Sequence, residues 1–191
     1  MLGCDLRSVP DHKLQVITSR DDAIFGVLLS SSHKAWSTRV GSWHGVSNDP
    51  QYTIGTTFGT FPFPEGLTPN IPAAAYADDP RAVAIGEAAR RLDELRTAWL
   101  NPPDLVRVEP EVAPGYPDRV LPRDAAAEKI LKTRTLTNLY NENPTWLVHA
   151  HRDLDAAVAA AYGWPADISE EAARARLLEL NRERAAGLVA S

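Results

Sequence analysis

Proline placement is the feature that most constrains how this chain folds. Eleven of the fifteen prolines lie between Phe61 and Pro122, and the other four are scattered. Proline lacks a backbone N–H and has a fixed φ, so it interrupts both helix interiors and strand ladders. The sequence therefore divides into residues 1–64, a proline-punctuated middle at 65–122 and a C-terminal block at 123–191.

Composition narrows the class of protein. The 191 residues carry a net charge of −5, and 44% are hydrophobic, which fits a folded chain with a sizeable core. No apolar run approaches the roughly 20 residues of a membrane-spanning helix, and no export signal is visible, so we expect neither membrane insertion nor secretion. Cys4 is the only cysteine, which excludes an intramolecular disulfide and favours a cytoplasmic location.

The first part predicts a strand, a broken helical stretch and then turns. Alternation of apolar and polar residues indicates a half-buried strand at residues 13–19. Asp21 and Asp22 suit a helix N-terminus, and apolar side chains follow at helical spacing. These are Ile24, Phe25, Leu28, Leu29, Trp36 and Val40, with a serine break at residues 30–32. Gly41 suits the left-handed position after a helix, and short strands are expected around residues 51–54.

The middle part predicts one amphipathic helix followed by a connector. Asp79 suits the cap and Pro80 the first helical position, and Asn101-Pro-Pro103 ends the helix. One seam is apolar, and the charged residues, Arg96 among them, are assigned to the other face. The seam comprises Ile85, Ala88, Leu92, Leu95 and Trp99. Residues 101–122 are interpreted as a proline-rich connector with a net charge of −2.

The last part is expected to be wholly helical. One helix is predicted from about Asp124 to Tyr140, a second after Asn143-Pro-Thr145 and up to the Gly163-Trp-Pro165 stop, and a third from Asp167, with Glu170 completing a capping box. The predicted inward residues are Leu147, Leu154, Val158, Leu177 and Leu180. The predicted fold class is α+β and mainly α-helical: a small mixed N-terminal part followed by a helical C-terminal segment.

No complete catalytic constellation is present in the sequence. Asn101-Pro-Pro103 is followed by Asp104 rather than by the aromatic residue that an amino-methyltransferase needs, so we interpret it as a helix stop. In the run from His149 to Asp155, only His151 and Asp155 share a helical face, and an exposed face is the favoured interpretation. Neither a phosphate-binding glycine motif nor a nuclease pattern occurs. We therefore predict no catalytic, cofactor-binding or metal-binding residue in this chain.

One polar stretch remains as a candidate binding segment. Its local charge is +1 in an acidic chain, because Lys34 and Arg39 oppose Asp49 alone. Its side chains are of the types that hydrogen-bond phosphates and base edges, although a solvated surface loop would have the same composition. The candidate DNA-binding residues are Ser31, Ser32, His33, Lys34, Arg39, Trp43, His44, Ser47, Asn48, Gln51 and Tyr52.

Several strings, in order, resemble one family of enzymes. The chain from about Lys13 to Ala186 resembles the C-terminal part of large single-chain, MmeI-like adenine-specific DNA methylases of restriction–modification systems. The matching strings are Phe25-Gly-Val-Leu28, Ser30, His33, Ala35-Trp36, Gly41, Ser47-Asn48, Tyr52-Thr53, Thr57-Phe58, Thr60-Phe61-Pro-Phe-Pro64, Trp99-Leu-Asn-Pro-Pro103, Arg134-Thr-Leu-Thr-Asn-Leu-Tyr140, Ala150-His-Arg-Asp-Leu-Asp155 and Ala160-Ala-Tyr-Gly-Trp-Pro165.

The resemblance implies a division of labour. Residues 1–64 would be the end of a target-recognition domain, 65–122 an amphipathic helix with its connector, and 123–191 a C-terminal helical segment. The AdoMet-binding methyltransferase domain would lie on a missing upstream region or on a separate polypeptide, and this chain would be a truncated product or a separately encoded piece. The catalytic domain would methylate adenine, while this region reads double-stranded DNA in a restriction–modification or phage-defence system.

Two alternatives stay open. In one, the chain is a helical docking module for a partner domain and no longer binds DNA; exposed Ile85, Leu92 and Trp99 would mark the missing partner. In the other, the chain is a small metalloenzyme that uses His149, His151 and Asp153 and contains bound metal.

Overall fold

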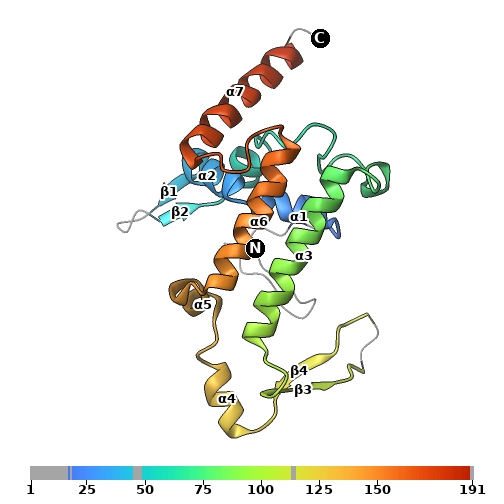
Figure 1. Ribbon diagram of the computed structural model, residues 1–191, viewed down its shortest axis with the longest axis vertical. Helices are drawn as coiled ribbons and strands as arrows, with labels where there is room; N and C mark the ends of the chain where they lie inside the picture. Colours follow the sequence, from blue (N-terminus) through green and yellow to red (C-terminus); the bar gives the residue numbers. More distant parts are fainter. Residues whose placement is uncertain (1–16, 18, 45–48, 113–114, 190–191) are drawn as a thin grey trace.

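The computed structural model of the chain describes residues 17, 19–44, 49–112 and 115–189. It is mainly helical with small antiparallel strand pairs, so the predicted α+β class is confirmed (Figure 1). In chain order the elements are α1 (Asp22–Leu29), α2 (Ser31–Val40), β1 (Ser42–His44), β2 (Asp49–Gln51), the π-helical turn η1 (Ile54–Phe58), the 3-10 turn η2 (Ala73–Ala75), α3 (Pro80–Leu100), β3 (Val106–Glu109), β4 (Arg119–Pro122), α4 (Ala125–Leu131), α5 (Leu136–Glu142), α6 (Thr145–Ala161) and α7 (Glu170–Val189). The strand expected at residues 13–19 lies almost entirely outside the described residues.

Helices α1 and α2 form the predicted helical stretch with its serine break. The Asp21 carboxylate accepts from the backbone N–H groups of Ala23 and Ile24 at 2.9 and 3.2 Å, which caps α1. The Ser30 hydroxyl donates to the Val27 carbonyl at 2.7 Å and accepts from the His33 N–H at 3.3 Å. One serine therefore ends α1 and caps α2.

The end of α2 departs from the prediction. Gly41 is the C-cap residue, but its φ of −63° is not left-handed, and its N–H continues the helix by donating to the Ser37 carbonyl. The chain leaves α2 in extended conformation and enters β1, so any residue could adopt this backbone. Short strands do follow, at β1 and β2, but Ile54 begins the turn η1 rather than lying in a strand.

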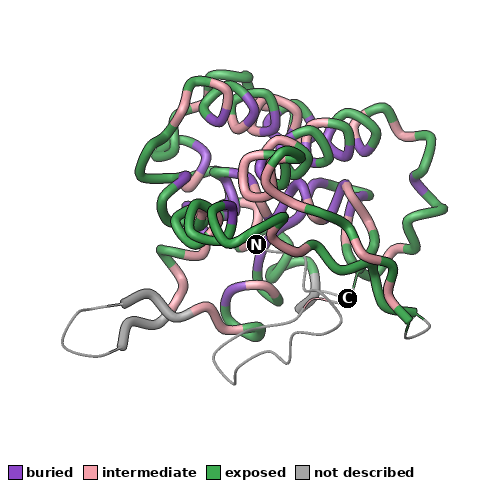
Figure 2. The backbone as a smooth tube through the Cα atoms, turned by 90° about the horizontal axis from the view of Figure 1, so that it is seen from below, coloured by how far each residue is buried: buried purple, intermediate pink, exposed green. Residues whose placement is uncertain are grey.

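The core is built on α3, which packs against α1 on one side and α6 on the other. Buried positions gather where the helices face one another (Figure 2). Ile85 and Leu92 of α3, with Leu154 and Val158 of α6, are each 0% exposed. The expectation that Ile85 and Leu92 would lack partners within their own chain is therefore wrong.

A glycine permits the closest contact in this core. A Cβ added at Gly26 of α1 would lie 2.5 Å from Ile85 Cγ2 and 3.1 Å from the Ile85 carbonyl oxygen. The absence of a side chain lets α1 approach the α3 backbone closely. Side chains of the proline run also enter the core, where Phe61 and Phe63 are each 5% exposed and meet edge to face.

The proline-rich connector at residues 101–122 contains a strand pair that is not predicted from its sequence. Strands β3 and β4 form an antiparallel hairpin whose register runs from Val106 opposite Pro122 to Glu109 opposite Arg119. Pro110 and Pro117 lie between the strands, where a missing N–H costs no ladder hydrogen bond. The alternation of valine with charged residues therefore produces strands here, even though prolines are frequent in this segment.

The C-terminal block contains four helices, and two boundaries differ from the prediction. The helix expected from Asp124 to Tyr140 divides into α4 and α5, because residues 132–135 turn and the Thr135 hydroxyl accepts from the Asn138 N–H as a new cap. Helix α7 starts at Glu170 rather than Asp167, with the Ser169 hydroxyl accepting from the Ala172 N–H. The capping box does not form; a serine cap replaces it.

Helix α6 agrees with its prediction. It begins at Thr145 and buries Leu147, Leu154 and Val158, and the chain then turns at Gly163, whose φ is +72°. In α7, Leu177 is fully buried and Leu180 only half-buried. A single set of buried side chains draws on all three predicted parts of the chain, whose division into functional regions stays an interpretation.

Candidate nucleic-acid interface and the adjoining cleft

Helix α2 has two different faces. Ala35 and Trp36 are buried, and the Trp36 Nε1 donates to the Thr57 carbonyl at 3.1 Å, which fixes α2 on η1. Of the predicted binding residues, Ser31, Lys34 and Arg39 are exposed. The structure thus separates a supporting face of α2 from an outward face that carries two cations.

Ser32 and His33 belong to the supporting face, since they are 6% and 4% exposed. His33 Nδ1 lies 3.0 Å from the Leu28 carbonyl oxygen, and its Nε2 lies 3.2 Å from the Tyr52 hydroxyl. These partners assign the proton to Nδ1, so the Tyr52 hydroxyl donates to Nε2. Burial lowers the pKa of His33 to about 4 and raises the pKa of Tyr52 to about 12, so both are neutral at neutral pH.

The other predicted residues lie around the β1–β2 pair. Trp43 and His44 are in β1 and Gln51 is in β2, where Trp43 stands opposite Pro50 and His44 opposite Asp49. Ser47 and Asn48 lie outside the described residues. The β1–β2 pair follows α2 directly, so these candidates lie on strands next to the C-terminal end of α2 (Figure 1).

The cations of α2 are not neutralised locally. Residues 31–48 contain neither aspartate nor glutamate. Among the residues that the structure describes, neither Lys34 nor Arg39 makes an ion pair. A surface with unpaired cations and hydroxyl side chains can bind phosphate groups.

A cleft of about 980 Å³ opens beside the N-terminal half of α2. It lies between α2, α5, α6 and residues 166–173, and Arg96 of α3 reaches it. The Ser31 N–H at the start of α2 donates to the Asp155 carboxylate of α6 at 2.7 Å. That bond ties α2 to α6 and satisfies one N–H at the helix N-terminus.

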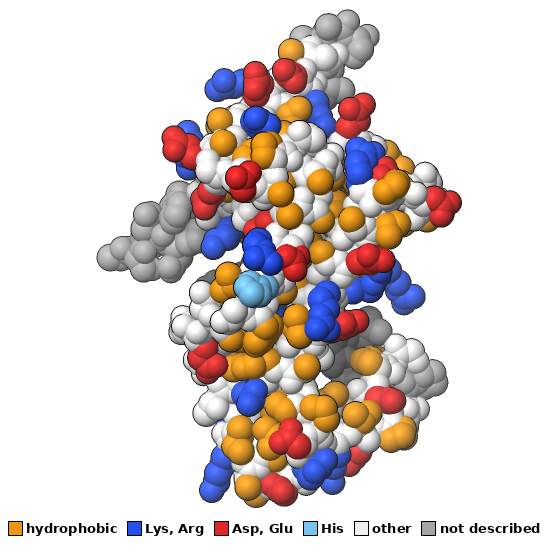
Figure 3. Space-filling view, in the orientation of Figure 1, with side chains coloured by type: hydrophobic (Ala, Val, Ile, Leu, Met, Phe, Trp, Pro, Cys, Tyr) orange, Lys and Arg blue, Asp and Glu red, His pale blue; other side chains and the backbone are white. Residues whose placement is uncertain are grey.

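His151 is one of the titratable residues that line this cleft. Its Nε2 lies 2.8 Å from the Tyr140 hydroxyl, and the two rings meet edge to face with centroids 5.6 Å apart. Burial lowers the pKa of His151; the nearby positive charges of Arg96 and Lys34 lower it further, and Asp155 opposes them. Figure 3 shows a histidine at mid-height of its face, among Lys, Arg, Asp and Glu side chains.

The residues from His149 to Asp155 lie on two different faces of α6, as their helical spacing predicts. His151 and Asp155 both line the cleft, whereas His149 and Asp153 point elsewhere and are exposed. Within the described ranges, no group of three or more His, Cys, Asp or Glu side chains could hold a metal ion. Nor does any helix there combine the length and apolarity of a membrane span.

Sequence reasoning missed Arg96 and Tyr140 as site residues. Arg96 was assigned to the polar face of α3, but it is 4% exposed, and its Nη2 donates to Asp93 at 3.0 Å. The spacing contained the signal, because Arg96 stands four residues after Leu92 and three before Trp99, on the apolar seam. Nothing in the local sequence around Tyr140 indicated its role, which depends on α5 packing beside α6.

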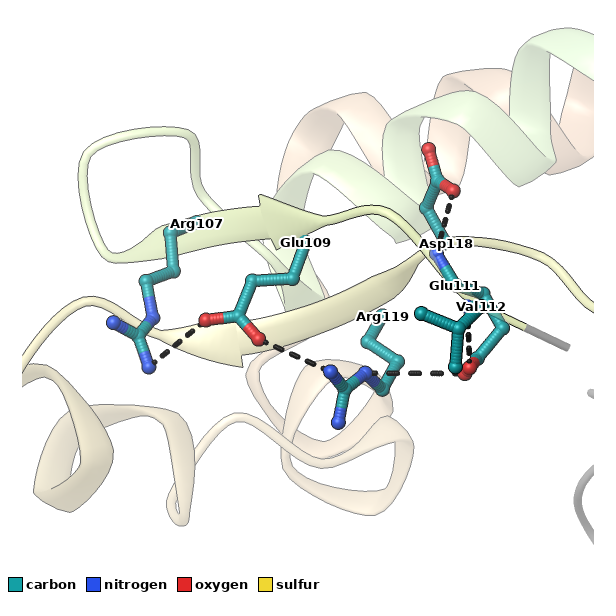
Figure 4. Close-up of polar contacts among 6 residues, drawn as sticks. All are labelled: Arg107, Glu109, Glu111, Val112, Asp118 and Arg119. Carbon is teal, nitrogen blue, oxygen red and sulfur yellow. Dashed lines mark hydrogen bonds and ion pairs between the residues drawn. The ribbon is translucent and has the colours of Figure 1, made fainter.

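A second surface lies on the β3–β4 hairpin. On one face, Glu109 pairs with Arg107 at 3.2 Å and with Arg119 at 3.3 Å, and Arg119 reaches Glu111 at 3.8 Å (Figure 4). Val108 and Val120, opposite each other in the register, form the other face and are 61% and 49% exposed. The polar face is satisfied internally, while the apolar face is open to solvent.

No family model, curated protein or solved structure matches the chain.

Proposed function

We propose that this chain is the DNA-contacting, target-recognition module of an adenine-specific DNA methyltransferase, inactive alone and completed by a catalytic polypeptide that binds AdoMet. The observation that carries the proposal is the outward face of α2. There Lys34 and Arg39 are exposed and unpaired among the described residues, in a stretch of eighteen residues without a carboxylate. The resemblance to MmeI-like methylases, in a restriction–modification or phage-defence system, supports the same function.

Each part of the surface has a chemical role in this proposal. Lys34 and Arg39 bind phosphates, which position the module without reading sequence. Trp43, His44, Ser47, Asn48, Gln51 and Tyr52 form or support the adjoining segment, which reads base edges in the major groove. Ser32 and His33 are buried on the supporting face of α2, where they hold the helix in position.

Titration of the purified chain against fluorescently labelled random duplex DNA tests the proposal. We expect saturable binding at low salt that weakens as salt increases, and a loss of at least about tenfold in affinity in the Lys34→Ala, Arg39→Ala variant. Lys129→Ala is the matched control, because Lys129 is an exposed lysine on α4, outside the proposed surface. Equal binding by wild type and double variant would contradict the assignment of DNA contacts to α2.

The exposed apolar face of the hairpin favours one second candidate. A helical docking module that binds a partner domain, and not DNA, would need such a face, and Val108 and Val120 provide it. Hydrophobic side chains are also prominent where α4, α5 and the hairpin lie in Figure 3. The duplex titration separates the two functions, because a docking module would show no salt-dependent binding.

A further inference from the structure

We propose that the cleft between α2, α5 and α6 is a nucleotide-binding site, which takes a nucleoside 5′-phosphate either free or as a unit of a single strand. The phosphate would lie toward Lys34 and Arg96, and the base would lie against Tyr140. This inference is independent of duplex recognition except at Lys34, which is exposed on α2 and also lines the cleft.

The size of the cleft suits such a ligand. Its volume of about 980 Å³ is near the top of the range for small-molecule sites, roughly 300–1,000 Å³. It combines apolar lining residues such as Leu28, Val148 and Ile168 with a few polar groups. A nucleotide needs both kinds of surface, because its base is flat and weakly polar while its phosphate is charged.

Three helices each supply a cation to this cleft. Lys34 comes from α2, Arg96 from α3 and Arg152 from α6, and all three line the cavity. Among the described residues Lys34 makes no ion pair, and Arg152 pairs only with its neighbour Asp153, at 3.2 Å. Cations from separate elements that line one cavity can bind a phosphate group.

Arg96 is the least expected of these cations, because its side chain is only 5% exposed. In the described structure its guanidinium has one protein acceptor, the Asp93 carboxylate. Among the described residues, every fully buried side-chain nitrogen or oxygen has a hydrogen-bond partner. The Arg96 nitrogens that have no partner are therefore not fully buried and reach solvent. Because Arg96 lines the cleft, these donors are available to an anionic oxygen inside it.

Aromatic and acceptor groups complete the site. Tyr140 is 42% exposed, and the bond between its hydroxyl and His151 fixes the ring at the cleft. A fixed, exposed aromatic ring is a stacking surface for a base. Asp155, Asp167 and Glu170 also line the cleft and can accept from amino or sugar hydroxyl groups.

Calorimetric titration of the whole chain tests the site, with deoxyadenosine 5′-monophosphate, deoxyadenosine and inorganic phosphate as separate probes. We expect the monophosphate to bind saturably and the nucleoside and phosphate to bind at least about tenfold more weakly, because each lacks half of the contacts. Absence of binding by the monophosphate and by a single strand would overturn the proposal. So would inorganic phosphate that binds as tightly as the nucleotide.

A single-stranded pentadeoxyadenylate separates the two sources of the ligand. Tighter binding of the strand than of the monophosphate assigns the site to a nucleic-acid strand, and equal or weaker binding assigns it to a free nucleotide. Both results support binding of a nucleoside 5′-phosphate in this cleft. Arg39 does not line the cleft, and Arg152 and Tyr140 are not part of the proposed duplex surface. Arg39→Ala therefore reports on duplex binding alone, and Arg152→Ala and Tyr140→Ser report on the cleft alone.

Variants of exposed side chains locate the binding without threatening the fold. We expect Lys34→Ala and Arg152→Ala to weaken binding of the monophosphate at least about fivefold, and Tyr140→Ser to do the same through loss of stacking. Arg91→Ala is the matched control for Arg152, because their side chains are 67% and 66% exposed and Arg91 does not line the cleft. Binding that survives all three cleft variants unchanged would place the nucleotide elsewhere and overturn the assignment.

Discussion

Helix α3 and the β3–β4 hairpin are adjacent in sequence but differ in how far their apolar side chains are buried. In α3, Ile85 and Leu92 are each 0% exposed where the helix packs against α1 and α6. In the hairpin the polar face is closed by its own ion pairs, while Val108 is 61% exposed. The centre of α3 is therefore covered within the described chain, whereas the hairpin presents an apolar face that nothing in the described chain covers.

The largest loss of stability is expected from a substitution at the buried centre of α3. Leu92→Ala would remove buried methyl groups and leave a cavity between helices, which costs about 2–5 kcal/mol of unfolding free energy. Urea denaturation followed by circular dichroism measures this loss. A change below about 1 kcal/mol would mean that the α3 seam is not the centre of the core.

A second large effect concerns pH and His33, on the supporting face of α2. Its pKa in the folded chain is about 4 against an ordinary value of 6.5, so the unfolded chain binds more protons between these values. The free energy of unfolding should therefore fall by roughly 3 kcal/mol as the pH decreases from 6.5 to 4.

Comparison with His33→Gln isolates this contribution from that of the carboxylates. The variant lacks the titrating imidazole, so its stability should decline less steeply over the same pH interval. Denaturation curves at several pH values provide the test, and parallel declines in the two proteins would contradict the buried, neutral state of His33.

A smaller loss is expected where α1 meets α3. Gly26→Ala would place a methyl group 2.5 Å from Ile85 Cγ2 and against the α3 backbone, so the two helices must separate. Overpacking of this kind costs about 1–3 kcal/mol, which exceeds the gain in helix propensity from alanine. Thermal denaturation measures it, and Gly187→Ala in α7, where a Cβ meets no atom within 4 Å, serves as the control. Stabilisation of both variants would disprove the close contact.

The smallest effect is expected in the hairpin. Val108→Thr keeps a β-branched side chain on an exposed strand, so the unfolding free energy should change by less than about 0.5 kcal/mol. The same denaturation assay applies. A loss as large as that of Leu92→Ala would show that the apolar face of the hairpin is covered within the chain.

Local signals predicted the elements whose ends are marked by side chains. Asp79, Pro80 and Asn101 defined α3, and Gly163 defined the end of α6, because caps and breakers act within a few residues. The β3–β4 hairpin was missed because the number of prolines masked the alternation of valine with charge. The break between α4 and α5 was missed because a threonine cap inside a polar run gives a weak signal.

The candidate site was only partly predictable, for a different reason. The exposed cations of α2 could be chosen from sequence, since a stretch without carboxylates is visible there. The burial of His33 could not, because Tyr52 and Phe61 from later segments pack on it. Nor could the meeting of Arg96 with Tyr140 and His151 at one cleft, because α3 is distant in sequence from α5 and α6. The spacing of residues along a helix shows which of them share a face. It does not show which other element of the chain packs on that face.

The salt dependence of duplex binding shows whether the cations of α2 contact DNA phosphates. Each phosphate contact contributes about one unit to the slope of log affinity against log salt concentration. We predict that the slope of the Lys34→Ala, Arg39→Ala variant is smaller than that of the wild type by about two units, while Lys129→Ala leaves it unchanged. Identical slopes in wild type and double variant, or no binding at low salt by the wild type, would contradict the account.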